Sequence, residues 1–444
     1  MRITHCVVLV GSILFAAFNI SATAQTINVA AIDSFITYIE QYNQGIGEVA
    51  ISQNGKIVYD RAFGKSAVPP DNGKYRIGSV SKLFTAILIH RLYKEKELTP
   101  NTTLDNDFPI FPTADSITIN HMLSHRSGLA DYVLKEDTLP LWLIHPVDEA
   151  DILNEIVRQG VLFAPGKDFR YSNTAYYLLR RIVERRYGLP YRDAVARYIT
   201  TPLGMYDTEA AVADKRAAAP SYQINTANCW QEVSDFYFPN VIGVGDIIST
   251  PQDLIKLIEA LFSDSTLGNT LATAMQPQGD DIFGCGMMMM PFYEHRFYGH
   301  AGDTFGTHSV VMYNPTDSIA IALCLNGCST PRNTLLIGIA SAIYDREYTY
   351  PDFSQLQQYI APPDSLSAYA GTFRSENFPL PFTITYDGKN LSLQVSGQPP
   401  VWLESKSPGI FVNTPTGTGI AFRDKDRFAF RQFGNLLIFN RVNK

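Results

Sequence analysis

The stretch RIGSVSKLFTA, residues 76–86, places a serine and a lysine three positions apart where a strongly apolar run begins. We expect a helix that opens at Ser79 and continues through Leu92, with the Ser79 hydroxyl and the Lys82 amine on one face. A serine hydroxyl is a weak nucleophile until a base within hydrogen-bond reach takes its proton. Burial under the apolar run would lower the pKa of Lys82 toward that of a usable base. The stretch therefore predicts a nucleophile beside its base, although a serine N-cap followed by a solvated lysine gives the same spacing.

The stretch PGKDFRYSN, residues 165–173, precedes a second apolar helical run. Tyr171 and Asn173 stand two positions apart, so in an extended or turn segment both side chains face one cleft. A phenol beside a lysine can relay a proton between the nucleophile and the leaving group. An asparagine amide can hydrogen-bond the lysine or the amide of a substrate. The alternative is a turn followed by a helix that Asn173 caps.

The stretch YGHAGD, residues 298–303, lies at an expected strand junction where glycines allow close backbone approach. His300 could contact the leaving group or a substrate carboxylate there. The backbone N–H of Asp303 could join that of Ser79 as an oxyanion hole. The alternative is a core or surface histidine in a glycine-rich turn.

These three stretches occur in the order Ser79-x-x-Lys82, Tyr171-x-Asn173 and His300-x-Gly302. In that order they resemble the serine β-lactamase-like family of SxxK serine hydrolases. The family includes class C β-lactamases, D-Ala-D-Ala carboxypeptidases, D-aminopeptidases and esterases. The resemblance covers about residues 30 to 345, and residues 119–129, 202–205 and 245–254 resemble further family landmarks.

The resemblance implies roles for the residues that carry it. Ser79 would be the acylated nucleophile, while Lys82 and Tyr171 would share proton transfer. Asn173 would position substrate and lysine, and His300 with Gly302 would form the far edge of the cleft. Class C β-lactamases begin their third motif with lysine, whereas a histidine there is more common among carboxypeptidases, peptidases and esterases. The departure lowers the expectation of efficient penicillin hydrolysis.

Hydrophobic periodicity predicts the architecture of the chain independently of this resemblance. A helix over residues 31–43 and a β-hairpin over residues 48–63 are followed by a long helical middle, then by strands and a closing helix. This order predicts an α/β fold of the α+β type, in which helices flank an antiparallel sheet beside an all-helical region. Residues 365–444 contain short strand-like runs and resemble the small lipocalin-like β-barrel that often follows this domain.

Residues 1–24 read as a cleavable signal peptide, because a short apolar run ends at small residues around Ala22 and Ala24. We therefore expect residues 25–350 to form the hydrolase domain, residues 351–364 a linker and residues 365–444 the barrel. The protein would be secreted or periplasmic, with no integral membrane span once the signal is removed.

Composition excludes several partners. The chain has 36 basic and 43 acidic residues, a formal net charge of -7, and no basic block, so nucleic acid is a poor partner. No cofactor and no metal is expected. His121 and His125 lie four apart on an expected helix, but no third ligand accompanies them. Disulfides among Cys229, Cys285, Cys324 and Cys328 stay open, and buried free thiols fit as well.

The sequence thus predicts an exported serine hydrolase that acts on an amide or ester carbonyl of a small-molecule or peptidoglycan-like peptide substrate. A D-Ala-D-Ala or D-amino-acid peptidase is the leading interpretation. An esterase or weak β-lactamase is the second. A penicillin-binding sensor module that acylates without turnover is the third.

Overall fold

The computed structural model describes most of the chain beyond residue 26. The described ranges are 27–64, 73–111, 113–133, 143, 145–224, 230–263, 267, 270–279, 281–353, 362–376, 378–398, 400–413, 418–432 and 435–442. The expected signal peptide and most of the expected linker lie outside these residues. The domain boundaries given above therefore stay predictions.

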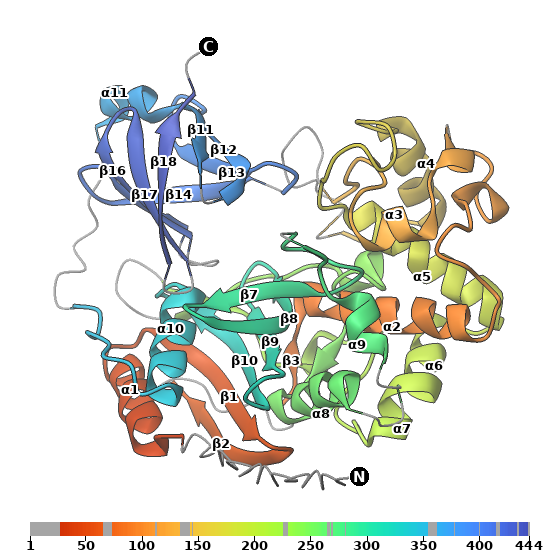
Figure 1. Cartoon of the computed structure of the whole chain (residues 1–444), viewed down its shortest axis with the longest axis horizontal. Coiled ribbons are helices and arrows are strands. Elements are labelled where there is room, and N and C mark those ends of the chain that lie inside the picture. Colours follow the sequence, from red (N-terminus) through yellow and green to blue (C-terminus); the bar gives the residue numbers. More distant parts are fainter. Residues whose placement is uncertain are drawn as a thin grey trace, which may run out of the picture.

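A mixed sheet forms the centre of the larger body (Figure 1). Six of its strands follow the order β2-β1-β10-β9-β8-β7, and the short strand β4 runs parallel to β10 and pairs with β5. The strands are β1 (Gly45–Gln53), β2 (Lys56–Phe63), β4 (Tyr222–Ile224), β5 (Trp230–Glu232), β7 (Met288–Phe292), β8 (His295–Asp303), β9 (His308–Asn314) and β10 (Ile319–Cys328). The predicted hairpin is confirmed, because β1 and β2 pair across Asn54 and Gly55, which both have positive φ as a tight hairpin turn requires.

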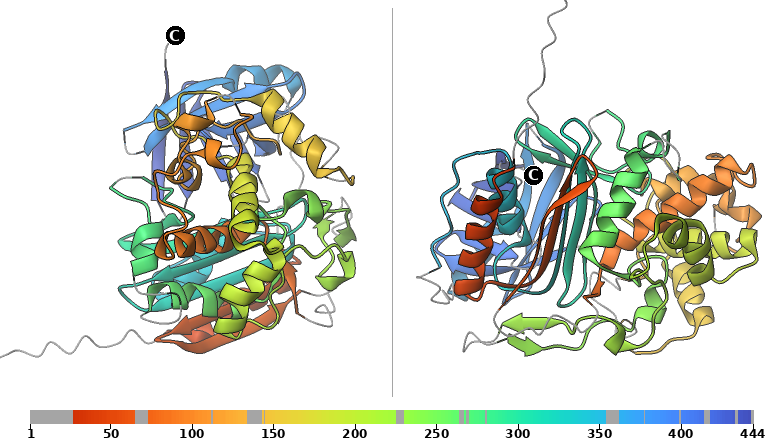
Figure 2. Two further views of the ribbon diagram at one scale, coloured as in Figure 1. Left: turned by 90° about the vertical axis from the view of Figure 1, so that its right-hand side faces the viewer. Right: turned by 90° about the horizontal axis from the view of Figure 1, so that it is seen from below.

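Two layers of helices cover the sheet, one on each face (Figure 2). Helices α1 (Val29–Gln41) and α10 (Arg332–Ile343) lie on one face, where Phe35 and Ile339 pack with strand residues such as Val310. Helices α2 (Ser81–Lys94) and α8 (Pro251–Phe262) lie on the other. The closing helix expected from the sequence is α10, which begins at Arg332.

The helical region extends from the second of these layers, as predicted. It contains the helices α3 (Ile119–Leu123), α4 (Glu149–Gln159), α5 (Asn173–Tyr187), α6 (Tyr191–Val195), α7 (Thr201–Leu203) and α9 (Thr270–Met275). Helix α2 is central to it, because its side chains from Leu83 to Ile89 are buried almost completely between the sheet and α5. A two-stranded sheet of β3 (Tyr75–Arg76) and β6 (Ile248–Ser249) leads the chain into α2.

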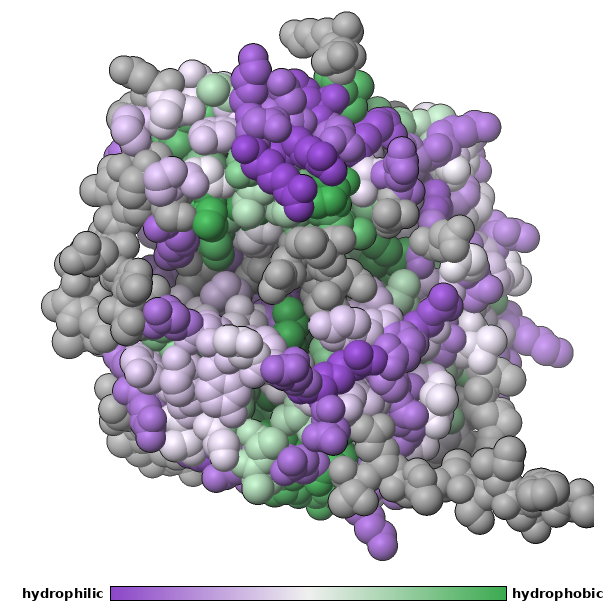
Figure 3. Space-filling view, turned by 60° about the vertical axis from the view of Figure 1, so that its left-hand side comes forward, coloured by the Kyte–Doolittle hydropathy of each residue, from purple (hydrophilic) through white to green (hydrophobic). Residues whose placement is uncertain are grey.

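The C-terminal part is a closed antiparallel barrel, as the strand-like runs predicted. Its strands are β11 (Gly371–Ser375), β12 (Phe378–Tyr386), β13 (Leu391–Val395), β14 (Val401–Ser407), β15 (Ile410–Asn413), β16 (Thr418–Asp424), β17 (Arg427–Gln432) and β18 (Asn435–Arg441). Buried phenylalanines such as Phe373, Phe382 and Phe439 fill its interior, so the barrel is a packed core and not an open cup. Hydrophilic side chains gather at the top of the molecule, where the barrel lies (Figure 3).

Cys285, Cys324 and Cys328 are free thiols, and Cys229 lies outside the described residues. Asn326 and Gly327 do not form the turn that a Cys324–Cys328 disulfide would need, since both lie inside β10. None of the helices in the described part of the chain has the length and hydropathy needed to cross a bilayer.

Candidate active site

Ser79 and Lys82 meet at the start of α2. Ser79 lies in a short 3₁₀ turn, η1 (Gly78–Val80), and the α-helix itself begins at Ser81, two residues later than predicted. The Lys82 Nζ donates hydrogen bonds to the Ser79 Oγ and to the carbonyl oxygen of Val244, both at 3.0 Å. The Lys82 side chain is fully buried. A solvated lysine behind a helix-capping serine therefore does not describe this pair.

Burial lowers the pKa of Lys82 to about 7, and the negative charges of Asp131 and Asp246 limit the decrease. A substantial fraction of the lysine is thus uncharged near neutral pH. The neutral amine has a lone pair that can accept the Ser79 proton over the 3.0 Å hydrogen bond.

Tyr171 covers the lysine. Its ring centroid lies 5.0 Å from the Lys82 Nζ, and its phenol interacts with the Ser79 side chain. Burial raises the pKa of Tyr171 well above its ordinary value, so the phenol keeps its proton at neutral pH. The Tyr171 ring stacks on the His125 imidazole with centroids 4.2 Å apart. His125 lies beyond the end of α3 with φ of 58° and accepts a hydrogen bond from the backbone of Ser172, so it supports the second motif.

Asn173 is the first residue of α5, and Ser172 caps that helix by accepting from the Ala175 N–H. The Asn173 Nδ2 donates to the Asp131 Oδ2 at 2.9 Å. Sequence reasoning missed Asp131, a buried carboxylate 42 residues away in the chain. This bond uses one of the two N–H donors of Nδ2, so Asn173 keeps the other N–H and its Oδ1 for other groups.

The third motif lies on β8 against the turn that carries the serine. A Cβ on Gly302 would stand 2.0 Å from the Ile77 carbonyl oxygen and 2.6 Å from the Ser79 nitrogen. A Cβ on Gly78 would stand 2.7 Å from the Asp303 nitrogen. The two backbones therefore approach closely only because both residues are glycines, and the backbone nitrogens of Ser79 and Asp303 both lie at this junction.

The serine turn can approach β8 because the last residues of this strand do not pair with β7. Strand β7 pairs with β8 only as far as Gly299, so residues 300–303 face η1 in its place. His300 is buried in this segment. Burial, together with the charge of Lys82, lowers its pKa to about 3, so the imidazole is neutral at physiological pH.

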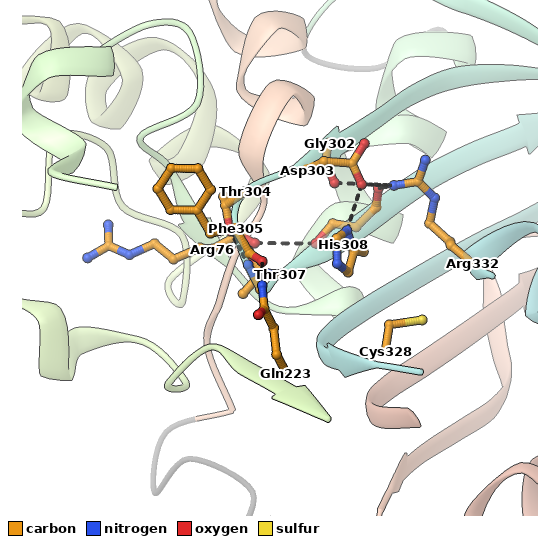
Figure 4. Close-up of polar contacts among 12 residues, drawn as sticks. Arg76, Gln223, Gly302, Asp303, Thr304, Phe305, Thr307, His308, Cys328 and Arg332 are labelled. Atoms are coloured by element: carbon orange, nitrogen blue, oxygen red, sulfur yellow. Dashed lines mark hydrogen bonds and ion pairs between the residues drawn. The ribbon is translucent and has the colours of Figure 1, made fainter. Parts of the chain in front are cut away.

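Two basic side chains hold the Asp303 carboxylate (Figure 4). Its Oδ1 lies 2.6 Å from the Arg332 Nη1 and 2.8 Å from the His308 Nδ1. Arg332 is the first residue of α10 and His308 is the first residue of β9. The two contacts therefore connect the end of β8 to α10 and to β9.

The barrel contacts the second motif directly. The backbone N–H of Tyr171 donates to the carbonyl oxygen of Gly397, in the turn after β13. Gly397 has φ of 80°, and a Cβ there would stand 2.3 Å from the Phe169 carbonyl oxygen. A side chain at this position would therefore push the barrel turn away from the site.

The chain is similar to known proteins over most of its length. Residues 35–341 match the family described as Beta-lactamase. Penicillin-binding protein 4* of Bacillus subtilis is 25% identical over 79% of this chain and 84% of its own length. A teichoic acid D-alanine hydrolase of Staphylococcus aureus is 26% identical over 63% of this chain and 70% of its own length.

Solved structures share the fold. The D-amino acid amidase of Ochrobactrum anthropi SV3 has a TM-score of 0.63 and 22% identity, covering 71% of this chain and 98% of its own. The octameric penicillin-binding protein homologue of Pyrococcus abyssi has a TM-score of 0.60 and 20% identity, covering 93% of this chain and 100% of its own. With a family match that spans most of its length, this chain belongs to the β-lactamase family of penicillin-binding-protein-like serine hydrolases.

Proposed function

We propose that the protein is an exported serine hydrolase that cleaves amide or ester bonds of D-amino acid residues through an acyl-enzyme on Ser79. The observation that carries the proposal is the 3.0 Å hydrogen bond between Ser79 Oγ and a fully buried lysine whose pKa is about 7. The names of the relatives support the D-amino acid part, since they include a teichoic acid D-alanine hydrolase and a D-amino acid amidase. Export rests on the signal-like residues 1–24.

In the acylation step, the Lys82 amine accepts the Ser79 proton while Oγ bonds to the carbonyl carbon of the substrate. The carbonyl oxygen becomes an oxyanion, which the N–H groups of Ser79 and Asp303 stabilise. When the oxyanion collapses, the bond to the leaving amine or alkoxide breaks. The leaving group takes a proton from the Lys82 ammonium through the Tyr171 phenol. Water then attacks the ester carbonyl on Ser79 and gives its proton to Lys82 through the Tyr171 phenol. When the bond to Oγ breaks, the Lys82 ammonium returns that proton to Oγ, and the acid is released.

The second candidate is acylation by β-lactams without efficient turnover. The penicillin-binding relatives favour it, and the chemistry up to the acyl-enzyme is the same. The two candidates differ in whether the ester on Ser79 is hydrolysed. A weak β-lactamase would release the product slowly, whereas a sensor module would keep it.

The test uses the full mature chain with D-phenylalanine amide, L-phenylalanine amide, p-nitrophenyl acetate, a D-Ala-D-Ala peptide and nitrocefin. We expect steady turnover of the D-amide, at least tenfold faster than of its L-isomer. Ser79→Ala should abolish turnover and labelling by a fluorophosphonate. Ser34→Ala, which changes an exposed serine on α1, is the matched control. A burst without turnover on every substrate would support the second candidate, and labelling that survives in Ser79→Ala would refute both.

A further inference from the structure

The backbone around Tyr171 is held by other segments of the chain. Arg170, Tyr171 and Ser172 belong to no helix or strand, so contacts from outside set their position. The N–H of Arg170 donates to the His125 carbonyl oxygen at 2.9 Å, and the N–H of Ser172 donates to the His125 Nδ1 at 3.1 Å. The N–H of Tyr171 itself donates to the carbonyl oxygen of Gly397. His125 therefore accepts the hydrogen bonds on both sides of the tyrosine.

The His125 imidazole also holds the Tyr171 ring. The two rings stack with their centroids 4.2 Å apart and an angle of 26° between their planes. The imidazole packs in addition on Tyr176 of α5, with centroids 5.1 Å apart. Tyr176 is anchored, because its phenol donates to the carbonyl oxygen of Leu123 at 2.8 Å. The orientation of the Tyr171 ring thus depends on an imidazole that packs on a fixed neighbour.

The position of His125 is demanding for a histidine. Its φ is 58°, a backbone conformation that a glycine adopts more easily, and its side chain is buried. Burial and the charge of Lys82 hold the pKa of His125 well below its ordinary value, so Nδ1 keeps its lone pair for Ser172 at neutral pH. A side chain kept at such a position indicates a role beyond the turn itself.

The Tyr171 phenol must reach two groups of the site. It interacts with the Ser79 side chain, and the ring centroid lies 5.0 Å from the Lys82 Nζ. Proton transfer requires heavy atoms within about 2.6–3.2 Å of each other. A displacement of the ring by about 1 Å would therefore interrupt the relay.

We propose that His125 is a positioning residue, which keeps the Tyr171 phenol against Ser79 and Lys82 by accepting from the backbone and by stacking on the ring. His125 acts through Tyr171 and needs no contact with the substrate. The inference rests on the proposed function, because it gives His125 a part in the acylation step.

The test is a double-mutant cycle on the full mature chain, measured as the second-order rate of fluorophosphonate labelling at pH 8. His125→Phe keeps a ring and removes the Nδ1 acceptor. His125→Asn keeps an acceptor and tolerates positive φ, but it removes the ring. Each change is made in the wild-type chain and in Tyr171→Phe.

We expect each His125 variant to label at least tenfold more slowly than the wild-type chain. In the Tyr171→Phe chain the same changes should slow labelling less than threefold, because no phenol is left to position. His295→Phe is the matched control, since His295 also stacks on a tyrosine, Tyr344, with centroids 3.6 Å apart at the start of β8. It should not change the rate in either chain.

Equal slowing in the two chains would overturn the inference, because it would show a general structural effect that does not pass through the phenol. Wild-type rates in both folded His125 variants would overturn it as well. If His125→Phe does not fold, His125→Asn completes the cycle alone.

Failure of the proposed function is a separate result, since fluorophosphonate labelling needs only an activated serine. If D-amino acid amides are not hydrolysed but the cycle shows the coupling, the proposed reaction fails and the role of His125 stands. If the amides are hydrolysed and the coupling is absent, the proposed reaction stands and the inference fails.

Discussion

The protonation state of Lys82 should control acylation, and its magnitude follows from the structure. With a pKa of about 7, the lysine is about 50% neutral at pH 7 and about 1% neutral at pH 5. If the neutral amine takes the Ser79 proton, the acylation rate should be constant above pH 8. It should decrease about fifty-fold between pH 7 and pH 5, in proportion to that fraction.

The assay is the second-order rate of fluorophosphonate labelling from pH 4.5 to pH 9. The other groups of the site do not imitate this curve, because burial lowers the pKa of His300 to about 3 and raises that of Tyr171 above the range. Return to pH 8 after exposure to pH 5 should restore the full rate, which separates titration from unfolding. A midpoint below pH 5, or one above pH 9, would refute the role of Lys82 as the base.

Asp131 offers a second check of the same reasoning. Its negative charge favours the protonated lysine, so Asp131→Asn should move the midpoint to lower pH. The same change removes the carboxylate that accepts from Asn173, so the plateau rate should also decrease. Asp33→Asn, which removes an exposed carboxylate paired with Arg61, should change neither quantity. A midpoint that stays in place in a folded Asp131→Asn variant would show that the charge does not reach the lysine.

Three further substitutions test the rest of the site. Tyr171→Phe keeps the ring and removes the phenol, so labelling should become about 10²–10⁴-fold slower while the melting temperature stays within about 2 °C; a wild-type rate would exclude the proton relay. Gly302→Ala sets a Cβ 2.0 Å from a backbone oxygen of the serine turn and should slow labelling about 10²–10³-fold. The barrel variant Gly419→Ala, whose Cβ has 3.9 Å of room, should label normally; equal rates in the two would contradict the oxyanion geometry. Gly397→Ala should slow labelling, whereas Gly388→Ala, also at positive φ but with nothing within 4 Å, should not; if both variants behave alike, the barrel contact has no role at the site.

Some features were predictable because they depend on residues close together in the chain. The Ser79 and Lys82 pair follows from one helical turn, and its hydrogen bond is internal to that turn. The hairpin of β1 and β2 follows from Asn54 and Gly55 between alternating apolar residues. Local spacing could not show that η1 precedes α2, because a 3₁₀ turn of three residues is too short to reveal a period different from that of an α-helix.

Other features depend on residues that meet only in the folded chain. Asp131 reaches Asn173 across 42 positions, and Arg332 reaches Asp303 across 29. No periodicity connects either pair. The contact of Gly397 with the backbone of Tyr171 joins two structural units, and backbone partners leave no signal in side-chain chemistry. The order of the motifs therefore predicted the reactive side chains. It did not predict the groups that position those side chains or shift their pKa values.

The burial of Lys82 connects the stability of the fold with its chemistry. A decrease in the lysine pKa from 10.5 to about 7 corresponds to about 5 kcal/mol that favours the neutral form in the folded state. Because the pKa of Lys82 is lower in the folded than in the unfolded chain, burying the lysine costs the folded state this free energy below pH 7. The cost disappears as the pH rises toward 10.5. The apolar packing of α2 against the sheet and α5 offsets the cost, and the same packing keeps water from the amine. The family motif therefore needs more than a serine three positions before a lysine: the residues after the lysine must be apolar enough to make the base neutral at the pH where the enzyme works.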